Sequence, residues 1–276
     1  MFEVALLYPD KQQGAAKRYG MPQDMGKDLN LSVILRAMAK EDEEIFTNCQ
    51  RVLLCPVTDE KTLHFRQQMV SDAVSHPEFY EEMYRIAKEA MQEIHKYTSK
   101  KTSNKVVQIT ESLDLLRILL KYLRYLKEHL RSEQAEKADA MYLFTTKFRE
   151  HFTDDFAKDL ERHIDDMAVL MQGGRLILTA GVAGGLKCGD AMESDIALLQ
   201  TVKQYYIEHG YSPSKADIPN QEALKQDAIR MEENGLLYTQ EIYREFLYQF
   251  QEFFSQLQIQ VGFYVGCANL GRSLHN

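Results

Sequence analysis

The sequence contains few residues that interrupt helices. Its 276 residues include only six prolines and fourteen glycines, and most of these fall in a few short stretches. Because proline and glycine are the strongest local breaks in regular structure, the long periodic segments between them are predicted to be helical. A hydrophobic content of 45% is enough to build a real core. The sequence therefore predicts an all-α, mainly helical fold.

Cysteine is also scarce. The chain has four cysteines, and they show neither C-x-x-C spacing nor the density of a secreted disulfide scaffold: Cys49, Cys55, Cys188 and Cys267. These thiols are interpreted as buried or idle side chains in a reducing compartment.

Long apolar runs are missing. No stretch of about 18 apolar residues exists, so no membrane span is predicted. The segment Met1–Pro9 contains apolar residues, but it has no basic region and is too short for a secretory signal. We therefore expect a cytoplasmic protein without a membrane partner.

Motifs for catalysis and cofactor binding are missing as well. The glycine-rich stretch from Gly181 to Cys188 resembles a P-loop but has Leu186 where the motif needs glycine and Cys188 where it needs serine or threonine. No nucleophile elbow is present. The chain itself is therefore predicted to have no catalytic residues and no cofactor.

Four side chains at helical spacing raise the question of a metal site: His151, Asp155, Asp159 and His163. Ligands on a facing helix would have to match them, as in di-iron bundles, and none is recognised. A solvated polar face is the predicted reading. The alternative, a helical-bundle metalloenzyme, would be settled by metal analysis.

Basic residues are fewer than acidic ones, which gives a formal net charge of -8. This charge argues against wrapping nucleic acid over the whole surface, so any DNA contact should be local. The candidate phosphate contacts are the lysines of a polar loop and two basic residues further on: Lys96, Lys100, Lys101, Lys105, Arg175 and Lys187. A second basic group is formed by Arg117, Lys121, Arg124 and Arg131. The alternative for both groups is solvated charge or pairing with acidic groups within the fold.

The most informative stretch that is present begins at Pro56. Proline stops the preceding apolar segment, and Thr58 is a good N-cap followed by the acidic residues Asp59 and Glu60, so a helix is predicted to start at about residue 58. Leu63, Val70 and Val74 are expected to form a stripe, broadened by Phe65 and Met69, that packs against other helices. The guanidinium of Arg66 is available to cap or pair a neighbour.

The order of these residues carries a resemblance. The string Pro56-Val57-x-Asp59-x-x-x-Leu63-x-x-Arg66-x-x-x-Val70 resembles the start of the helical core domain, domain III, of the MutS family of DNA mismatch-repair ATPases. The chain departs from that family in having Ile45 and Thr47 where a Gly-x-Arg run is usual, and in lacking the Phe-x-Glu that reads mismatches. The resemblance therefore implies a divergent MutS-like branch.

The resemblance also sets expectations for the domains. Residues 1–133 are expected to form a helical core, and residues 134–172 and 238–276 two long antiparallel lever helices. Residues 173–237 are expected to form a distal, clamp-like tip with a small strand and turn element near 174–190. The phenylalanines at 246, 250, 253 and 254 are interpreted as lever packing, with a partner-binding surface as the alternative.

Local signals predict further helices. One short helix is expected at Asp28–Leu35, and a second helix from the capping signal at Ser75–Glu78 to about Tyr97. A leucine-rich helix at Ser112–Arg131 is apolar on nearly every face and is predicted to be buried. The segment from Phe2 to Tyr8 is read as either a strand or an irregular apolar tail.

The function implied by the resemblance is that of a core and lever region. It would couple DNA binding to the nucleotide state of a carboxy-terminal ATPase domain, which this chain lacks. ATP and magnesium would belong to the full-length protein, which could act as a homodimer on DNA. The rival hypothesis is a stand-alone helical interaction or scaffold protein that uses its coiled-coil-like helices to bind partners.

Overall fold

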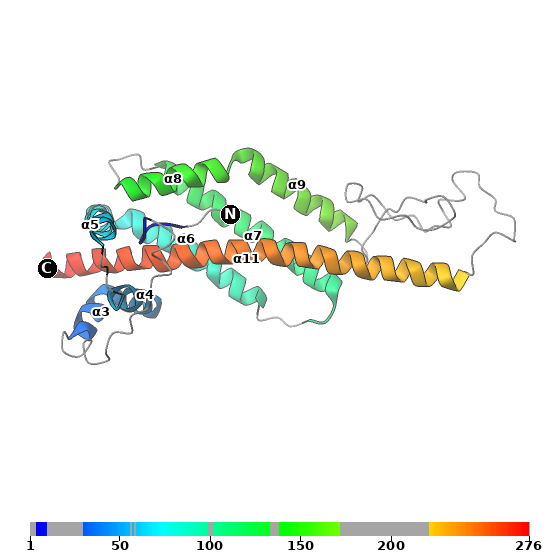
Figure 1. Cartoon of the computed structure of the whole chain (residues 1–276), viewed down its shortest axis with the longest axis horizontal. Coiled ribbons are helices and arrows are strands. Elements are labelled where there is room, and N and C mark those ends of the chain that lie inside the picture. Colours follow the sequence, from blue (N-terminus) through cyan, green and yellow to red (C-terminus); the bar gives the residue numbers. More distant parts are fainter. Residues whose placement is uncertain are drawn as a thin grey trace. The chain divides into compact units, whose positions relative to one another are not determined.

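The computed structural model describes residues 4–9, 30–55, 57, 59–98, 102–132, 138–171 and 221–275. Within these ranges the chain forms eight helices and no strand, so the predicted mainly helical fold is confirmed (Figure 1). The helices are α3 (Leu31–Ala39), α4 (Glu43–Leu53), α5 (Glu60–Ser75), α6 (Pro77–Thr98), α7 (Lys105–Ser132), α8 (Asp139–His151), α9 (Asp154–Leu170) and α11 (Gln221–His275). The strand expected near 174–190 lies outside the described residues.

The chain divides into two compact units. Unit 1 comprises Met1–Thr98, Ile118–Ala157 and Tyr248–Asn276, and unit 2 comprises Ser99–Arg117 and Lys158–Leu247. Both α7 and α11 therefore contribute residues to both units. The expected division into core, levers and tip stays a prediction.

Helix α4 had no counterpart among the predicted elements, although its start signal is local. The side chain of Asp42 accepts hydrogen bonds from the amides of Glu44 and Ile45, and the first turn is acidic. These features satisfy free N–H groups and complement the helix dipole. Helix α3 packs beside α4 and begins after Asn30, whose positive φ of 48° is a left-handed conformation that asparagine tolerates (Figure 1).

Helix α5 begins later than predicted. Its N-cap is Asp59, whose side chain accepts a hydrogen bond from the amide of Thr62 at 2.7 Å, whereas Thr58 lies outside the described residues. Aspartate and threonine are both good N-caps, so the composition of the stretch did not separate them. Asp59 therefore caps the helix directly, in addition to placing negative charge near the helix start.

The predicted packing face of α5 is confirmed only in part. Met69 is fully buried as expected, and Phe65 and Val70 are half-buried, but Leu63 is 46% exposed and Val74 40% exposed. Arg66 shares the buried face because its guanidinium serves an amino-terminal segment, as described below. The buried face of α5 therefore combines a polar contact with the apolar residues Met69 and Ala73.

Helices α6 and α7 follow their sequence signals. Helix α6 starts at Pro77, where the missing N–H is harmless, and ends one residue past the predicted Tyr97. Helix α7 starts earlier than predicted because Asn104 Oδ1 accepts hydrogen bonds from the amides of Val106 and Val107. Its leucines are buried as expected, at positions 113, 115, 116, 119, 120, 123, 126 and 130.

The first expected long helix is two helices. Phe152 leaves the helical conformation at the end of α8, and Thr153 Oγ1 accepts a hydrogen bond from the amide of Phe156 in the first turn of α9. The stripe of phenylalanines four residues apart suggested continuity. The local start signal, a threonine followed by Asp154 and Asp155, prevailed over that periodicity.

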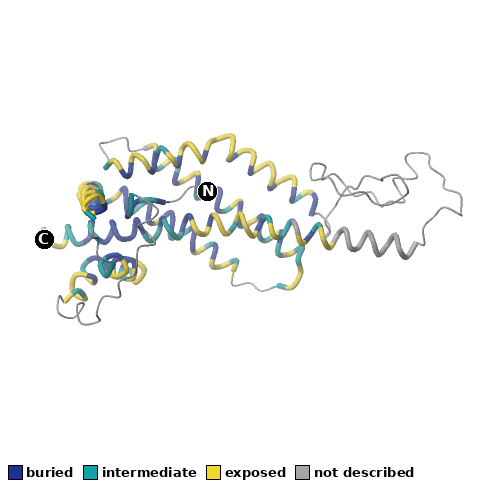
Figure 2. Tube along the Cα trace, in the orientation of Figure 1, coloured by how far each residue is buried: buried dark blue, intermediate teal, exposed yellow. Residues whose placement is uncertain are grey.

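The second expected long helix is longer than predicted. Helix α11 begins at Gln221 instead of Tyr238 and has 55 residues, which corresponds to roughly 80 Å at 1.5 Å per residue. Figure 2 shows its carboxy-terminal part mainly as buried or intermediate. Phe250, Phe253 and Phe254 are buried there, which confirms that this aromatic face packs within the fold, and Phe246 is 37% exposed. In unit 1, Phe253 stacks on Phe148 of α8.

Candidate functional site

An extended segment at the amino terminus is bound inside unit 1. We call residues Val4–Tyr8 the amino-terminal strap. It forms no strand, so of the two alternatives the irregular apolar segment is the observed one. Val4, Leu6 and Leu7 are buried, with at most 4% of their surface exposed. A non-helical segment buried this deeply must find partners for its main-chain polar groups.

Two side chains of α11 supply most of these partners. Gln260 Oε1 accepts hydrogen bonds from the amides of Leu6, at 2.8 Å, and Leu7, at 3.0 Å, while its Nε2 donates to the carbonyl of Val4 at 2.8 Å. The hydroxyl of Tyr264, one turn further along, donates to the carbonyl of Leu6. Both side chains are at least 93% buried. Because a primary amide has both donors and an acceptor, one glutamine can serve three main-chain groups.

Arg66 of α5 binds the end of the strap. Its Nε donates to the carbonyl of Leu7 at 3.0 Å, and its guanidinium carbon lies 4.5 Å from the centre of the Tyr8 ring. The residue is 9% exposed, and its Nη2 is buried without an acceptor among the described residues. The arginine of the MutS-like string therefore fastens the strap to the helical core by a hydrogen bond and a cation–π contact.

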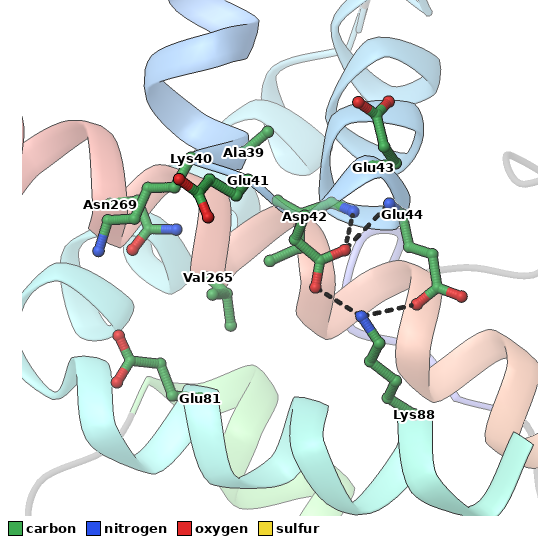
Figure 3. A pocket seen from close by; sticks show the side chains of 11 residues that line it. Ala39, Lys40, Glu41, Asp42, Glu43, Glu44, Glu81, Lys88, Val265 and Asn269 are labelled. Atoms are coloured by element: carbon green, nitrogen blue, oxygen red, sulfur yellow. Dashed lines mark hydrogen bonds and ion pairs between the residues drawn. The ribbon is translucent and has the colours of Figure 1, made fainter. Parts of the chain in front are cut away.

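A charged pocket lies where α3 turns into α4. Its volume is about 850 Å³. Five of its lining residues are carboxylates and two are lysines: Glu41, Asp42, Glu43, Glu44, Glu81, Lys40 and Lys88. Figure 3 shows the Lys88 ammonium directed at two carboxylates, with Nζ 2.7 Å from Asp42 Oδ2 and 3.2 Å from Glu44 Oε2. The excess of carboxylates disfavours phosphate, so this pocket is unsuited to DNA or nucleotide.

The electrostatics of the pocket centre on Asp42. Partial burial by itself would raise the pKa of this carboxyl group, but the hydrogen bonds from Lys88 and from the amides of Ile45 and Glu44 together hold the pKa below its usual value. The hydroxyl of Tyr84 also donates to this carboxylate. Asp42 thus both caps α4 and joins α4 to α6 through Lys88.

Replacing Asp42 by asparagine is expected to give a pH-dependent loss of stability. Asparagine keeps the N-cap but not the charge. Because the folded-state pKa of Asp42 is depressed, its contribution is fully present above the unfolded-state pKa of roughly 4 and disappears as pH falls through the folded-state pKa. The difference in unfolding free energy between wild type and Asp42→Asn should therefore be largest above about pH 5 and shrink below about pH 4.

Urea denaturation between about pH 3 and about pH 7 measures this difference. In a Lys88→Met background the pH-dependent part should be smaller, because Lys88 supplies the opposing charge. A difference that stays constant across the whole range would contradict the role assigned to the Asp42 charge.

Further side chains of α11 bind the small helices of unit 1. Asn269 Nδ2 donates to the carbonyl of Met38 at 2.9 Å, and Gln258 Nε2 donates to Glu44 at 2.7 Å. At Gly266, a Cβ atom would lie only 2.4 Å from the sulfur of Cys49, so the glycine permits the close approach of α4. Burial raises the pKa of the Cys49 thiol to about 12, which fits the predicted idle, buried cysteine.

The candidate phosphate contacts are only partly described. Lys96 lies near the end of α6, where Nζ is 2.6 Å from Glu93 Oε1, and Lys105 opens α7. The remaining four, Lys100, Lys101, Arg175 and Lys187, lie outside the described residues. DNA contact by this set stays a prediction.

Five of the six residues named in the MutS-like string have different environments. Asp59 caps α5 and Arg66 binds the strap, as described above. Leu63 is exposed, Val70 is half-buried, and Pro56 lies outside the described residues.

The four-residue stripe on α8 and α9 does not gather into a metal site. His151 Nδ1 is 2.9 Å from the carbonyl of Lys147, Asp159 pairs with Arg162, and His163 Nε2 is 3.1 Å from the hydroxyl of Tyr243 in unit 2. No group of three or more metal-binding side chains is found in the part of the chain that the structure describes.

The second basic group is largely engaged within the fold. In unit 2, Arg117 Nη2 lies 2.7 Å from Asp165 Oδ1. In unit 1, Lys121 lies over the ring of Tyr125 and Arg131 pairs with Glu128. These contacts fit the alternative of internal pairing.

Sequence reasoning missed the residues that bind the strap on α11. Gln260 is a single polar residue within the apolar stripe of Leu257, Val261 and Tyr264, and this interruption was the available signal. A buried glutamine must be hydrogen-bonded, but the sequence did not say to what. The ion pair between Lys88 and Asp42 could not be predicted from the sequence, because 46 residues separate the two side chains.

Across the described helices, none is long and apolar enough to span a membrane.

Comparison with known proteins found a matching family. The profile of the MutS2 N-terminal domain matches residues 58–276, well over half of the chain. Neither a curated protein nor a solved structure matches the sequence. The matched region includes Asp59, Arg66, Gln260 and Tyr264. The chain therefore belongs to the MutS2 N-terminal domain family.

Proposed function

We propose that this chain is the core and lever region of a MutS2-type DNA repair or recombination ATPase. The observation that carries the proposal is α11, a continuous helix of 55 residues that contributes to both compact units. A helix shared in this way is suited to transmit a displacement along its axis, because its hydrogen bonds resist bending. The family membership supplies the link to a MutS2-type protein.

The proposed role is coupling and not chemistry. DNA contacts in residues 173–237 or in the lysine-rich loop that holds Lys100 and Lys101 would be linked to the nucleotide state of an ATPase domain elsewhere in the protein. That domain would bind ATP and magnesium, and a homodimer would form mainly through it. The chain itself would turn over no substrate and would act in the cytoplasm on DNA.

A DNA-binding titration across salt concentrations tests the DNA part of this proposal. We expect salt-sensitive binding with a preference among mismatched, branched and plain duplexes. Reversing two charges of the polar loop, with Lys100→Glu and Lys101→Glu together, should weaken binding to all duplexes and reduce the salt slope by about 2. The matched control is Lys158→Glu, an exposed lysine on α9 that should leave binding unchanged.

Two results would contradict the proposal. Absence of DNA binding at low salt would show that this chain has no DNA contacts of its own and serves only as a mechanical connector. Stoichiometric ATP turnover by the purified chain would contradict the assignment of chemistry to another domain.

One observation favours a second candidate, the helical interaction protein. Leu63 and Val74 on α5 are exposed aliphatic residues on one helix, and Leu274 near the end of α11 is 76% exposed. Exposed apolar side chains at helical spacing are suited to bind another helix. The gene sequence discriminates the candidates: an in-frame P-loop downstream of Asn276 supports the ATPase, and a natural stop codon there supports the interaction protein.

A further inference from the structure

The strap is bound in the manner of a peptide ligand. Among the described residues, every hydrogen bond to its main chain comes from a side chain of α5 or α11: Arg66, Gln260 and Tyr264. No main-chain ladder joins it to the helices. The strap can therefore leave without breaking a single hydrogen bond inside a helix.

The groove that holds the strap recognises an extended chain. Gln260 forms hydrogen bonds with two consecutive amides and a carbonyl of the strap. It therefore recognises an extended main chain rather than a particular side chain. The apolar side chains of Val4, Leu6 and Leu7 are buried at the same place. Main-chain hydrogen bonds combined with buried aliphatic residues are the usual basis of extended-peptide recognition.

Docking of the strap carries a cost at Arg66. Its Nη2 is buried and has no acceptor among the described residues, and an unsatisfied buried donor opposes the state that buries it. The docked state thus contains one unsatisfied buried donor, while the hydrogen bonds of Gln260 favour it.

We propose that the groove between α5 and α11 is an exchangeable peptide-binding site, occupied by the strap of its own chain and able to accept the strap of a second copy. Both copies offer the same contacts, so exchange makes no new interaction and loses none. Residues 10–29 join the strap to Asn30. A connection of that length can reach about 70 Å when extended, enough to serve a neighbouring molecule. The proposal does not depend on the proposed DNA function.

The test frees the groove without altering it. In the full chain, Leu6→Asp places a charge at a site that is fully buried, so the strap should undock while Gln260, Tyr264 and Arg66 remain. A fluorescent peptide with the sequence of residues 1–9 is then titrated and its anisotropy measured. We expect the peptide to bind the Leu6→Asp chain at least tenfold more tightly than wild type, whose own strap competes.

Two matched controls make the result specific. A peptide that itself carries Leu6→Asp should not bind, and a chain carrying both Leu6→Asp and Gln260→Leu should bind the unmodified peptide at least tenfold more weakly. Circular dichroism of the Leu6→Asp chain should show wild-type helix content. Failure of this chain to fold would overturn the proposal, because the strap would then be an inseparable part of the core. Absence of binding to a folded Leu6→Asp chain would overturn it as well.

Discussion

A proline at position 251 is expected to lower the free energy of unfolding by at least about 3 kcal/mol. Gln251 is exposed and lies in the interior of α11, so the substitution Gln251→Pro removes no buried contact. It removes instead the main-chain hydrogen bond to the carbonyl four residues earlier, and the ring clashes with that carbonyl. The effect therefore measures the continuity of α11, on which the proposed lever depends.

The matched variant is Gln251→Ala. Alanine is the best helix former, so this variant should keep or slightly raise the stability of the chain. Urea denaturation followed by circular dichroism compares the two variants. A proline variant as stable as wild type would show that α11 is already interrupted near residue 251, which would contradict the proposed lever.

Truncation of Phe254 is expected to cost about 3 to 5 kcal/mol of unfolding free energy. The Phe254 side chain is fully buried, and its ring meets that of Phe253 edge-to-face with centroids 5.3 Å apart. The substitution Phe254→Ala removes the ring and leaves a cavity that the close-packed neighbours fill only in part. Thermal and urea denaturation of the full chain measure the loss.

Tyr248 provides the control for this truncation. It lies on the same helix but is 59% exposed, so Tyr248→Ala should change the unfolding free energy by no more than about 0.5 kcal/mol. Equal effects of the two truncations would contradict the packing role of the aromatic face. They would favour instead the alternative in which these aromatic residues serve a partner.

Local signals predicted the helices best. Pro77 marks the start of α6, and the leucines of α7 are buried because a helix that is apolar on nearly every face has to be covered by neighbours. Where local signals competed, periodicity misled. The phenylalanine stripe across α8 and α9 concealed the cap at Thr153, and the stripe predicted on α5 included Leu63 and Val74, which are exposed.

Arg66 shows why the face of α5 was beyond sequence reasoning. An arginine on a helix is usually placed in solvent, and the sequence indicated only that its guanidinium could cap or pair some neighbour. Its burial depends on the carbonyl of Leu7 and the ring of Tyr8, which lie nearly sixty residues earlier in the chain. Only the folded chain brings these groups together.

By itself, the sequence determined the helical class, the start of α6 and the relation to MutS-like proteins, because caps, breakers and short motifs act over a few residues. Tertiary structure alone decided which polar residues became interior contacts. Gln260 and the strap are separated by more than 250 residues, and the partners of a buried amide are set by which helices pack together. The same holds for Asp42 and Lys88, whose charges meet only because α4 packs near α6.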